Sequence, residues 1–353
     1  MKAQILLSVL AVMTAGSMYN SMAEQPKNLQ FTIQSENMKI AHAYAQWKAK
    51  NRRLYGTPAE DSYRKEVFGK NFMYIEETNS KEESFKLALN SFADKTLEEI
   101  KAAHFGLGDL KDVEAPAPQT HRTLQFGPIF SPPVSKDWHE LDTMNKVVHQ
   151  GSCGSCYAFA TIVSLEHMYY LKTGKKARLS EQELVDCSKG HGNAGCRGGW
   201  MHQAYDYVIQ NEGIQLASSY PYVGTENSFC KYDSQKNVKG LLSSYVKINK
   251  NDNDHIVMAL QNTVVPSAVD AGELSFYSSG VFDKKTCSAT INHAIVIVGY
   301  GETKSGVKYW NVRNSWGPDW GVHGHFKLLR HTGKQQGICG ITQYNVYPVP
   351  HSD

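Results

Sequence analysis

All seven cysteines of the chain follow residue 152, and an odd number cannot all be joined in disulfides within one molecule. In an exported protein this count predicts three disulfides and one free thiol, although sequence alone leaves many possible pairings open. The region before residue 152 must therefore fold without any disulfide, and the region after it must keep one sulfur unpaired. The cysteines are Cys153, Cys156, Cys187, Cys196, Cys230, Cys287 and Cys339.

The N-terminus has the features of an export signal. Lys2 gives a positive start, and an apolar run follows from Ile5 to Met13. Ser21 and Ala23 provide the small side chains of a cleavage site, so residues 1–23 are predicted to be a signal peptide. A transmembrane anchor is disfavoured because the run is far shorter than the roughly 20 residues needed to cross a bilayer. No later run is apolar enough, so no stable membrane insertion is expected.

Length and composition indicate a globular protein with more than one folded unit. The chain has 353 residues, which is too long for one ordinary core and suits two or three units. Apolar residues make up 41% and charged residues 20%, a globular rather than a disordered balance. The net charge is only +3, and no run of Lys or Arg exceeds two residues, so nucleic acid is not expected as a partner.

Residues 24–131 have the pattern of a separate, mainly helical region. Helix-forming residues run from Ser35 to Asn79, and an interruption at residues 56–58 predicts two helices. An alternating apolar run from Phe85 to Phe92 predicts a strand. The segment from Thr96 to Ala103 predicts a short helix, because threonine is a good N-cap and two glutamates follow it.

A proline-rich stretch from Ala115 to Pro133 predicts a linker between this region and the rest of the chain. Exposed linkers of this composition are where proteolysis concentrates. The main domain is therefore expected to occupy residues 132–353.

The main domain divides into a helical half and a β-rich half. The first, about residues 140–240, combines helices with loops, and its strongest helix candidate runs from Ser155 to Lys172. The second, about residues 241–344, favours strands, and the segments 294–300 and 308–313 are predicted to be neighbours in a sheet. A cleft between the two halves is expected.

The run from Gln150 to Phe159 contains two cysteines in a C-x-x-C spacing, which fits a redox pair, half of a zinc site or a structural disulfide. Zinc is disfavoured because no second C-x-x-C or matching histidine pair is present, and a redox pair would again leave an odd number of cysteines. In the remaining alternative, Cys153 is bridged and Cys156 is free at the start of a helix. There the helix dipole, and a nearby protonated histidine, stabilise a thiolate.

Three motifs in order resemble the papain family of cysteine proteases. Cys153 to Tyr157 fits the signature C-G-[SA]-C-[WY], and His293 falls within the accompanying spacing of about 130–150 residues. Asn292 to Gly301 resembles the histidine strand of that family, and Asn311 to Gly321 resembles its asparagine motif. The resemblance covers about residues 35–350. It implies an α+β, papain-like fold of two domains, helical and β-barrel-like, with an active-site cleft between them and a mainly helical inhibitory propeptide in front.

The resemblance implies a role for each catalytic residue. Cys156 is the nucleophile, and His293 is its base and then the proton donor to the leaving amine. Asn314 holds the far ring nitrogen of the imidazole, and Trp316 covers that hydrogen bond from water. The Gln150 side chain and the Cys156 backbone N–H donate to the oxyanion, and one such donor is worth about 3 kcal/mol of barrier. No metal or cofactor is implied.

The resemblance also implies the disulfides and the substrate contacts. The pairs are Cys153 with Cys196, Cys187 with Cys230, and Cys287 with Cys339. The backbone of Gly198 and Gly199 is expected to run antiparallel to the substrate, where a side chain would block its approach. The substrate-binding residues are Gly154, Gly198, Gly199, Trp200, Met201, Ala268, Ile291, Asn292, Trp316 and Tyr344.

Substrate preference is expected from the pocket for the second residue before the cut, the S2 pocket. Its residues are Trp200, Met201, Ala268, Ile291 and Tyr344. The pocket is apolar, has no acidic floor and is shortened by Tyr344, which predicts Val or Leu over Arg. The propeptide has no cysteine, and no His-His insertion lies between Cys196 and Cys230, so an endopeptidase is favoured over the exopeptidase branches. Tyr157 replaces the usual Trp, and Asn292 stands where many relatives have Asp.

The early region resembles the inhibitory propeptide of cathepsin L-like proteases. Six residues match a motif spaced along one helical stripe, namely Glu60, Arg64, Phe68, Asn71, Ile75 and Asn79. Asn90, Phe92 and Asp94 resemble a second motif, although its opening glycine is Ala88 here. A zymogen is implied, whose propeptide lies through the cleft in the non-cleavable direction. Acid is expected to weaken its contacts, partly by protonating Asp94, before a cut near Pro132.

The implied partners are protein or peptide substrates, the chain's own propeptide and cystatin-type inhibitors, and a monomer is expected. The secretory pathway is the expected route, to a lysosome- or food-vacuole-like acidic compartment or to the outside. No N-x-Ser/Thr sequon is present to favour either. Two alternatives remain: a catalytically silent binding protein, disfavoured because Cys156, His293 and Asn314 are all present, and a transpeptidase or ligase on the same scaffold.

Overall fold

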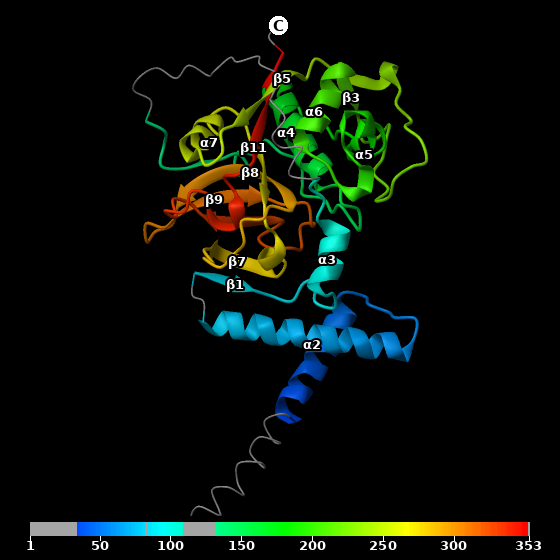
Figure 1. Ribbon diagram of the computed structural model, residues 1–353, viewed down its shortest axis with the longest axis vertical. Coiled ribbons are helices and arrows are strands. Elements are labelled where there is room, and N and C mark those ends of the chain that lie inside the picture. Colours follow the sequence, from blue (N-terminus) through cyan, green and yellow to red (C-terminus); the bar gives the residue numbers. More distant parts are fainter. Residues whose placement is uncertain (1–33, 82–83, 109–130, 352–353) are drawn as a thin grey trace, which may run out of the picture. The chain divides into compact units, whose positions relative to one another are not determined.

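The computed structural model describes residues 34–81, 84–108 and 131–351 (Figure 1). Its contacts divide the chain into two compact units, residues 1–74 and 75–353. The predicted signal peptide and most of the proline-rich linker lie outside the described residues. Within the described part, no helix combines the length and the apolar character needed to cross a membrane.

The first unit is helical, as the sequence predicts. Residues 34–50 form one helix, and α2 spans Pro58–Lys81, passing into the second unit at its C-terminal end. The predicted interruption at residues 56–58 therefore separates two helices. Proline is well tolerated at the first position of a helix, where its missing N–H has no intrahelical partner to lose.

Aromatic side chains and one carboxylate join the two helices of the first unit. The rings of Tyr44 and Trp47 lie 5.2 and 5.4 Å from the ring of Phe68, which is fully buried. The Asp61 carboxylate accepts hydrogen bonds from the Tyr44 hydroxyl and the Lys48 ammonium, each at 2.7 Å. The hydrogen bond from Lys48 is the main cause that lowers the pKa of Asp61.

The second unit begins with the end of α2 and a short strand. β1 (Phe85–Leu87) pairs antiparallel with β7 (Tyr277–Phe282), so the early region supplies one strand of the main sheet. The predicted strand from Phe85 to Phe92 is too long. The chain turns because the Asn90 side chain accepts the Phe92 backbone N–H at 2.9 Å, a local bond that competes with a sheet ladder.

Helix α3 (Leu97–His104) follows this turn, within one residue of its predicted bounds. Thr96 and Glu99 form a capping box, in which each side chain accepts the backbone N–H of the other residue. The preceding α2 is fixed to β1 by Asn79, whose side chain makes two hydrogen bonds to the backbone of Leu87.

The helical half of the main domain is built around one buried helix. α4 (Cys156–Thr173) ends at Gly174, which adopts φ of 68° as a left-handed cap. α5 (Glu181–Cys187) begins at Ser180, whose side chain accepts a backbone N–H of its first turn. α6 (Met201–Gln210) packs on α4, and all three helices lie together in Figure 1, coloured green.

The β-rich half is a nine-stranded sheet with the order β1-β7-β10-β9-β8-β6-β11-β5 and with β2 paired to β8. The remaining strands of this sheet are β2 (Lys136–Asp137), β5 (Leu242–Ile248), β6 (Val265–Val269), β8 (His293–Glu302), β9 (Lys308–Arg313), β10 (His325–Leu329) and β11 (Asn345–Pro350). A small sheet pairs β3 (Gly213–Gln215) with β4 (Asn237–Lys239), and α7 spans Asn253–Ala259. The predicted neighbours β8 and β9 are antiparallel partners. The β-rich half extends past its predicted end at 344, because β11 continues it.

The core places two chain segments beside each other. α4 packs against β8, and nine of the ten residues of β8 are buried, which makes it a central strand. Cys156 is the first residue of α4 and His293 is the first residue of β8. The junction of the helical and β-rich halves therefore brings together the starts of two elements that lie far apart in the sequence.

Candidate active site

Cys156 is the unpaired cysteine, and its side chain is fully buried. Three disulfides join Cys153 to Cys196, Cys187 to Cys230, and Cys287 to Cys339, which are the pairs that the resemblance implies. The disulfide of Cys153 fixes the loop that leads into α4, where Gly154 donates its N–H to the Cys196 carbonyl at 2.9 Å. The nucleophile candidate is thus held at the first turn of a helix.

The sulfur of Cys156 is surrounded by backbone N–H groups. Ala294 donates its N–H to the sulfur at 3.4 Å, which ties the thiol to the residue after His293. Burial raises the pKa of the Cys156 thiol to about 11, although backbone N–H groups of Ala294, Gly106 and Tyr157 act in the opposite direction. In this form of the chain the thiol keeps its proton at neutral pH.

His293 is oriented by Asn314. Its Nε2 lies 2.8 Å from Asn314 Oδ1, and the same oxygen accepts the Ser315 backbone N–H at 2.8 Å. Since that oxygen is an acceptor, Nε2 of a neutral His293 is the protonated nitrogen and Nδ1 is left with its lone pair. Nδ1 is buried and makes no hydrogen bond within the described residues, so it is available as a base.

The surroundings of His293 exclude water. The Trp316 ring lies 4.7 Å from the imidazole, and both side chains are at most 2% exposed. Burial lowers the pKa of His293 to about 4, although the hydrogen bond to Asn314 acts in the opposite direction. The covering role expected of Trp316 is consistent with this position. The imidazole is therefore neutral beside a neutral thiol.

Gln150 is the third group at this junction and is fully buried. Its Oε1 accepts the Ser315 hydroxyl at 2.6 Å, and its backbone N–H donates to the Ser315 carbonyl at 2.9 Å. Its Nε2 donates to the carbonyls of Cys153, at 2.8 Å, and of His104, at 3.0 Å. The donor expected to bind an oxyanion therefore contacts a carbonyl at the end of α3.

The segment after α3 runs along the same site. Gly199 donates its N–H to the Gly106 carbonyl at 3.1 Å, and Gly108 donates to the Gly199 carbonyl at 3.3 Å. The bridge between Leu107 and Gly199 is parallel, which is the reverse of the direction expected for substrate. A side chain at Gly106 would overlap the backbone of Gly154, so only glycine permits this close approach.

Aromatic rings extend this contact. Phe105 stacks on Trp316 with ring centroids 6.1 Å apart and planes 8° apart. Phe92 meets the same indole edge-on at 5.2 Å and also contacts the His104 ring at 4.9 Å. Residues 92–108 thus cover the junction of the two halves with apolar surface.

The predicted S2 residues come together beneath this segment. Trp200, Met201, Ala268, Ile291 and Tyr344 belong to one buried cluster, and Leu107 packs against it. The Tyr344 ring contacts the Trp200 ring at 4.7 Å, and its hydroxyl is hydrogen-bonded to His202 Nδ1 at 2.8 Å. Tyr344 therefore points inward and is 3% exposed.

The remaining predicted contacts are also placed by the structure. Gly198 has φ of 114°, a conformation that favours glycine, and it adjoins Gly199 at the segment described above. The side chain of Asn292 is turned toward the protein: it donates to the Asp270 carboxylate at 2.9 Å and accepts the Ala271 N–H at 3.0 Å. In the part of the chain that the structure describes, no group of three His, Cys, Asp or Glu residues is arranged to hold a metal ion.

Four residues at the site were missed by sequence reasoning. Ser315 lies inside the asparagine motif, and its position next to Asn314 is the only local signal that could have found it. His104, His202 and Tyr222, whose hydroxyl donates to the Gln150 backbone carbonyl, reach the site through contacts between distant segments, which neither periodicity nor spacing reveals.

Two family models match the chain. The model described as papain family cysteine protease matches residues 132–349, and the model described as cathepsin propeptide inhibitor domain (I29) matches residues 44–100. Vignain from Phaseolus vulgaris is 37% identical over 316 residues, covering 88% of this chain and 85% of vignain. Digestive cysteine proteinase 2 from Homarus americanus is 38% identical over 316 residues, covering 86% of this chain and 95% of that protein.

Solved structures of precursor forms are also similar. Digestive procathepsin L2 proteinase from the larval midgut of Tenebrio molitor matches with a TM-score of 0.79 and 34% identity. The match covers 88% of this chain and 99% of that structure. The similarity therefore includes both the early helical region and the main domain.

Proposed function

Because the chain belongs to the papain family of cysteine proteases and carries the inhibitor propeptide of cathepsins, we propose that it is an endopeptidase precursor that uses Cys156, His293 and Asn314. The observation that carries this proposal is the chain of contacts Asn314–His293–Ala294–Cys156. It joins an oriented imidazole to a sulfur at a helix N-terminus.

In the proposed reaction, the Cys156 thiolate attacks the carbonyl carbon of the scissile peptide bond, and His293 is protonated. The negative oxygen receives hydrogen bonds from the Gln150 side chain and the Cys156 backbone N–H. The carbon–nitrogen bond then breaks, and His293 gives its proton to the leaving amine, which leaves a thioester on Cys156. Water then attacks the thioester as His293 takes its proton, and the carbon–sulfur bond breaks, which releases the acid product and restores the Cys156 thiolate beside protonated His293.

The precursor is inactive in this proposal for two physical reasons. The segment 104–108 fills the site in the direction opposite to substrate, and the His104 carbonyl takes the Gln150 donor. Burial by this segment also keeps the thiol of Cys156 and the ring of His293 neutral. Removal of the segment hydrates both groups, so that a thiolate–imidazolium pair becomes the favoured state.

The direct test is labelling of the acid-treated protein with an epoxide that alkylates cysteine proteases, followed by mapping of the modified residue. Label on Cys156, together with loss of peptidase activity, is the expected result. The untreated precursor and the Cys156→Ser variant serve as controls that remain unlabelled. Label on another residue, or full activity after alkylation of Cys156, would refute the proposal. Product analysis with an added amine separates hydrolysis from transpeptidation or ligation.

The proposed specificity is for a medium-sized apolar residue, Val or Leu, at the second position before the cut. The inward position of Tyr344 and its hydrogen bond to His202 support a shortened apolar pocket. A peptide library that varies this position is expected to favour Val and Leu. A profile dominated by Arg would contradict the proposed pocket.

Processing is proposed to remove a signal peptide, residues 1–23, and a propeptide, residues 24–131, from a monomeric mature enzyme, residues 132–353. Secretory export would deliver it to an acidic compartment or to the outside, and cystatin-type proteins would act as its inhibitors. N-terminal sequencing after acid activation tests the boundary, and a first residue far from 125–135 would refute it.

A further inference from the structure

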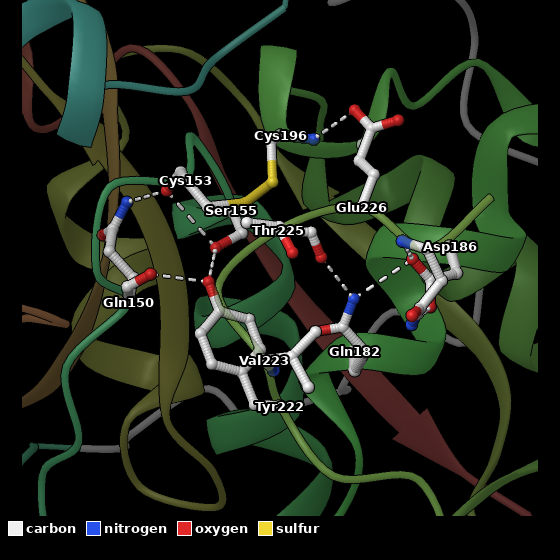
Figure 2. Close-up of a disulfide and its surroundings, with 12 residues drawn as sticks. Gln150, Cys153, Ser155, Gln182, Asp186, Cys196, Tyr222, Val223, Thr225 and Glu226 are labelled. Carbon is white, nitrogen blue, oxygen red and sulfur yellow. Dashed lines mark hydrogen bonds between the residues drawn. A yellow bond between two sulfur atoms is a disulfide. The ribbon is translucent and has the colours of Figure 1, made fainter.

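A tyrosine that belongs to none of the three motifs joins the two ends of the loop in front of the nucleophile. The Tyr222 hydroxyl donates to the Gln150 backbone carbonyl at 2.6 Å and lies 2.8 Å from the Ser155 hydroxyl (Figure 2). A tyrosine has one O–H proton, and a carbonyl cannot donate, so Ser155 is the donor to Tyr222. The hydrogen bonds therefore run from Ser155 through Tyr222 to Gln150.

Both residues contacted by Tyr222 bear on the reacting groups. Ser155 is the N-cap residue of α4, immediately before Cys156, and Gln150 carries the proposed oxyanion donor. The ring of Tyr222 packs edge-on against Phe159 on the second turn of α4, with centroids 4.9 Å apart. Burial raises the pKa of Tyr222 to about 12, so its hydroxyl remains a donor at neutral and acidic pH.

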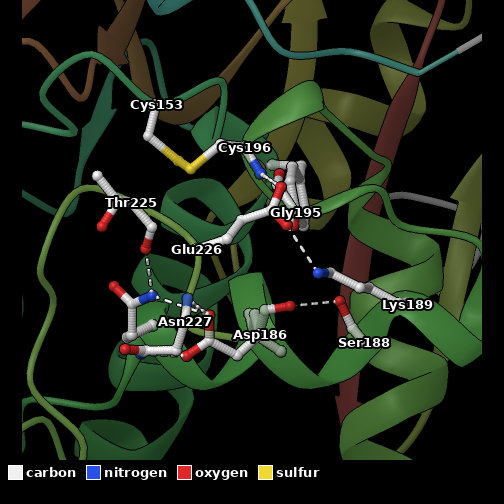
Figure 3. A network of polar contacts seen from close by, with 12 residues as sticks. Cys153, Asp186, Ser188, Lys189, Gly195, Cys196, Thr225, Glu226 and Asn227 are labelled. Carbon is white, nitrogen blue, oxygen red and sulfur yellow. Dashed lines mark hydrogen bonds and ion pairs between the residues drawn. A yellow bond between two sulfur atoms is a disulfide. The ribbon is translucent and has the colours of Figure 1, made fainter. Parts of the chain in front are cut away.

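The segment from Tyr222 to Asn227, here called the strap, is fastened to α5. Val223 donates its N–H to Gln182 Oε1 at 2.9 Å, and Gln182 Nε2 donates to the Thr225 carbonyl at 2.8 Å (Figure 2). At the other end, the backbone and side-chain N–H groups of Asn227 donate to Asp186, at 2.9 and 2.7 Å (Figure 3). The buried side chains of α5 thus fix the backbone position of the strap.

Glu226 connects the strap to the disulfide on the opposite side of the loop. Its Oε1 accepts the Cys196 backbone N–H at 2.8 Å, and its Oε2 pairs with Lys189 at 2.7 Å (Figure 3). The hydrogen bond from Lys189 is the main cause that lowers the pKa of Glu226. Since Cys196 is bonded to Cys153, the strap contacts the loop at Gln150, Ser155 and the disulfide.

We propose that Tyr222 is a positioning residue for peptide-bond hydrolysis, which fixes Gln150 relative to the N-terminus of α4. The inference rests on the proposed oxyanion role of Gln150. Two donors from different parts of the loop must point at one oxygen, and a displacement of about 1 Å at such a site costs up to about 100-fold in rate. Tyr222 holds the backbone of one donor residue and the cap of the helix that carries the other.

The test compares Tyr222→Phe with Tyr205→Phe in enzyme processed from the full chain. The Tyr205 hydroxyl likewise lies 2.6 Å from a serine hydroxyl on α4, that of Ser164, which is nine residues after Ser155. Tyr222→Phe loses its hydrogen bonds to Gln150 and Ser155, whereas Tyr205→Phe loses the one to Ser164. Tyr205→Phe therefore controls for the loss of a tyrosine–serine contact, and both variants are expected to lose some thermal stability. Only Tyr222→Phe is expected to lower kcat, by about tenfold, with KM nearly unchanged.

A second readout separates positioning from a general structural effect. The rate at which Cys156 is alkylated, or exchanges with 2,2′-dipyridyl disulfide, reports the fraction of thiolate. Neither reaction needs an oxyanion donor. This rate and its pH profile are expected to be the same in Tyr222→Phe and in the unmodified enzyme. Equal loss of kcat in the two tyrosine variants, or a shifted profile in Tyr222→Phe, would overturn the inference.

The double variant tests whether Tyr222 acts through Gln150. If it does, Tyr222→Phe adds little further loss to Gln150→Ala, whereas independent roles give multiplied losses and overturn the inference. Full kcat in Gln150→Ala would instead refute the proposed oxyanion role, on which the inference depends. Should Tyr222→Phe fail to fold, Ser155→Ala removes the other hydrogen bond and is expected to lower kcat by a smaller factor, and unchanged kcat there overturns the inference.

Discussion

The carbonyl oxygen of His104 accepts a hydrogen bond from the side-chain amide of Gln150 at 3.0 Å. A backbone carbonyl of the proposed propeptide therefore uses the donor that the proposed mechanism reserves for the oxyanion. The adjoining residues pair in parallel with Gly199, so the carbonyl is presented by a chain of reversed direction. The segment thus makes contacts like those expected of a substrate, but its chain runs in the opposite direction.

Gly106→Ala is expected to weaken the hold of the propeptide on the site. A methyl group there would overlap the Gly154 backbone, so the segment must shift away from the cleft. At a fixed acidic pH, conversion to the mature enzyme is expected to be about tenfold faster, as measured by gel electrophoresis. A tenfold change corresponds to about 1.4 kcal/mol. Gly56→Ala is the matched control, because no atom lies within 4 Å of the added group. Unchanged conversion by Gly106→Ala would contradict the close approach.

Activation is expected to speed up as the pH falls below about 6.5. Burial is the main cause that lowers the pKa of His104 to about 3, helped by the charges of Lys95, His149 and His293, and burial lowers that of His293 to about 4. Both rings regain their ordinary pKa when the segment leaves, so the open form binds more protons between pH 6.5 and about 4 and is favoured by acid.

The rate of conversion should be measured from pH 7 to 4 in the precursor and in His104→Phe, which keeps an aromatic ring but cannot titrate. A shallower dependence on pH is expected in the variant. The same slope in both proteins would exclude a contribution from His104 to the acid response.

Asn314→Ala is expected to narrow the pH range of the active ion pair. The hydrogen bond that His293 donates to Asn314 raises the pKa of His293, so its loss lowers that pKa and shifts the alkaline limit of thiolate–imidazolium reactivity to lower pH. A shift of roughly one pH unit corresponds to the usual strength of a charged hydrogen bond. Reaction of the mature enzyme with 2,2′-dipyridyl disulfide measures it. Asn311→Ala in β9, three residues before Asn314, loses a hydrogen bond to Asp137 instead, and its pH profile is expected to stay unchanged.

Two buried carboxyls are expected to make the folded protein more stable in acid. Burial raises the pKa of Glu166 and of Glu183 to about 7, above the ordinary value of 4.5. A raised pKa in the folded state contributes stability that is complete below 4.5 and is lost as the pH rises through 7. Buried His167 and His325 act oppositely, since burial lowers the pKa of these rings to about 4 and 3.

The measurement is the melting temperature between pH 4.5 and 7.5 in a Cys156→Ala background, which prevents self-digestion. Glu183→Gln is expected to flatten the decline of the melting temperature toward pH 7.5. The control variant Glu140→Gln, at an exposed position, is expected to leave that decline unchanged. An identical decline in the two variants would argue against the role of Glu183.

Tyr344→Ala is expected to deepen the S2 pocket. The ring is buried against Trp200 and fixed by His202, so its removal leaves apolar space rather than a charge. Preference in a peptide library is expected to move from Val and Leu toward Phe, with little gain for Arg. An unchanged profile would mean that Tyr344 does not border the second side chain before the cut.

The motifs in the sequence led to the residues that carry chemistry, but not to the contacts that arrange them. Cys156, His293 and Asn314 each stand in a recognisable run. The predicted helix carries Cys156, whereas His293 begins a strand whose predicted start is one residue later, and Asn314 directly follows β9. Ser315, Tyr222 and His104 hold the side chain or backbone of Gln150 through pairings across the chain. Such pairings depend on packing between distant segments and leave no periodic signal in the sequence.

The errors in the predicted strands have local causes. Phe85 to Phe92 alternates like a strand, yet the Asn90 side chain captures a backbone N–H and ends the strand at Leu87. In β11, Pro348 and Pro350 oppose a strand assignment, because proline cannot donate to a ladder. The strand nevertheless forms through its antiparallel pairing with β5, which outweighs local preference.

The pairing of β1 with β7 has a consequence for the life of the molecule after processing. The residues of β1 leave with the proposed propeptide, so Tyr277–Phe282 then becomes the outermost strand of the sheet. Outermost strands attract further strands, and natural proteins commonly protect them. Maturation would thus expose a new edge strand on the enzyme, with backbone groups free to pair with another strand. Before the proposed processing, the same early segment therefore covers one side of β7 as well as the site of the thiol.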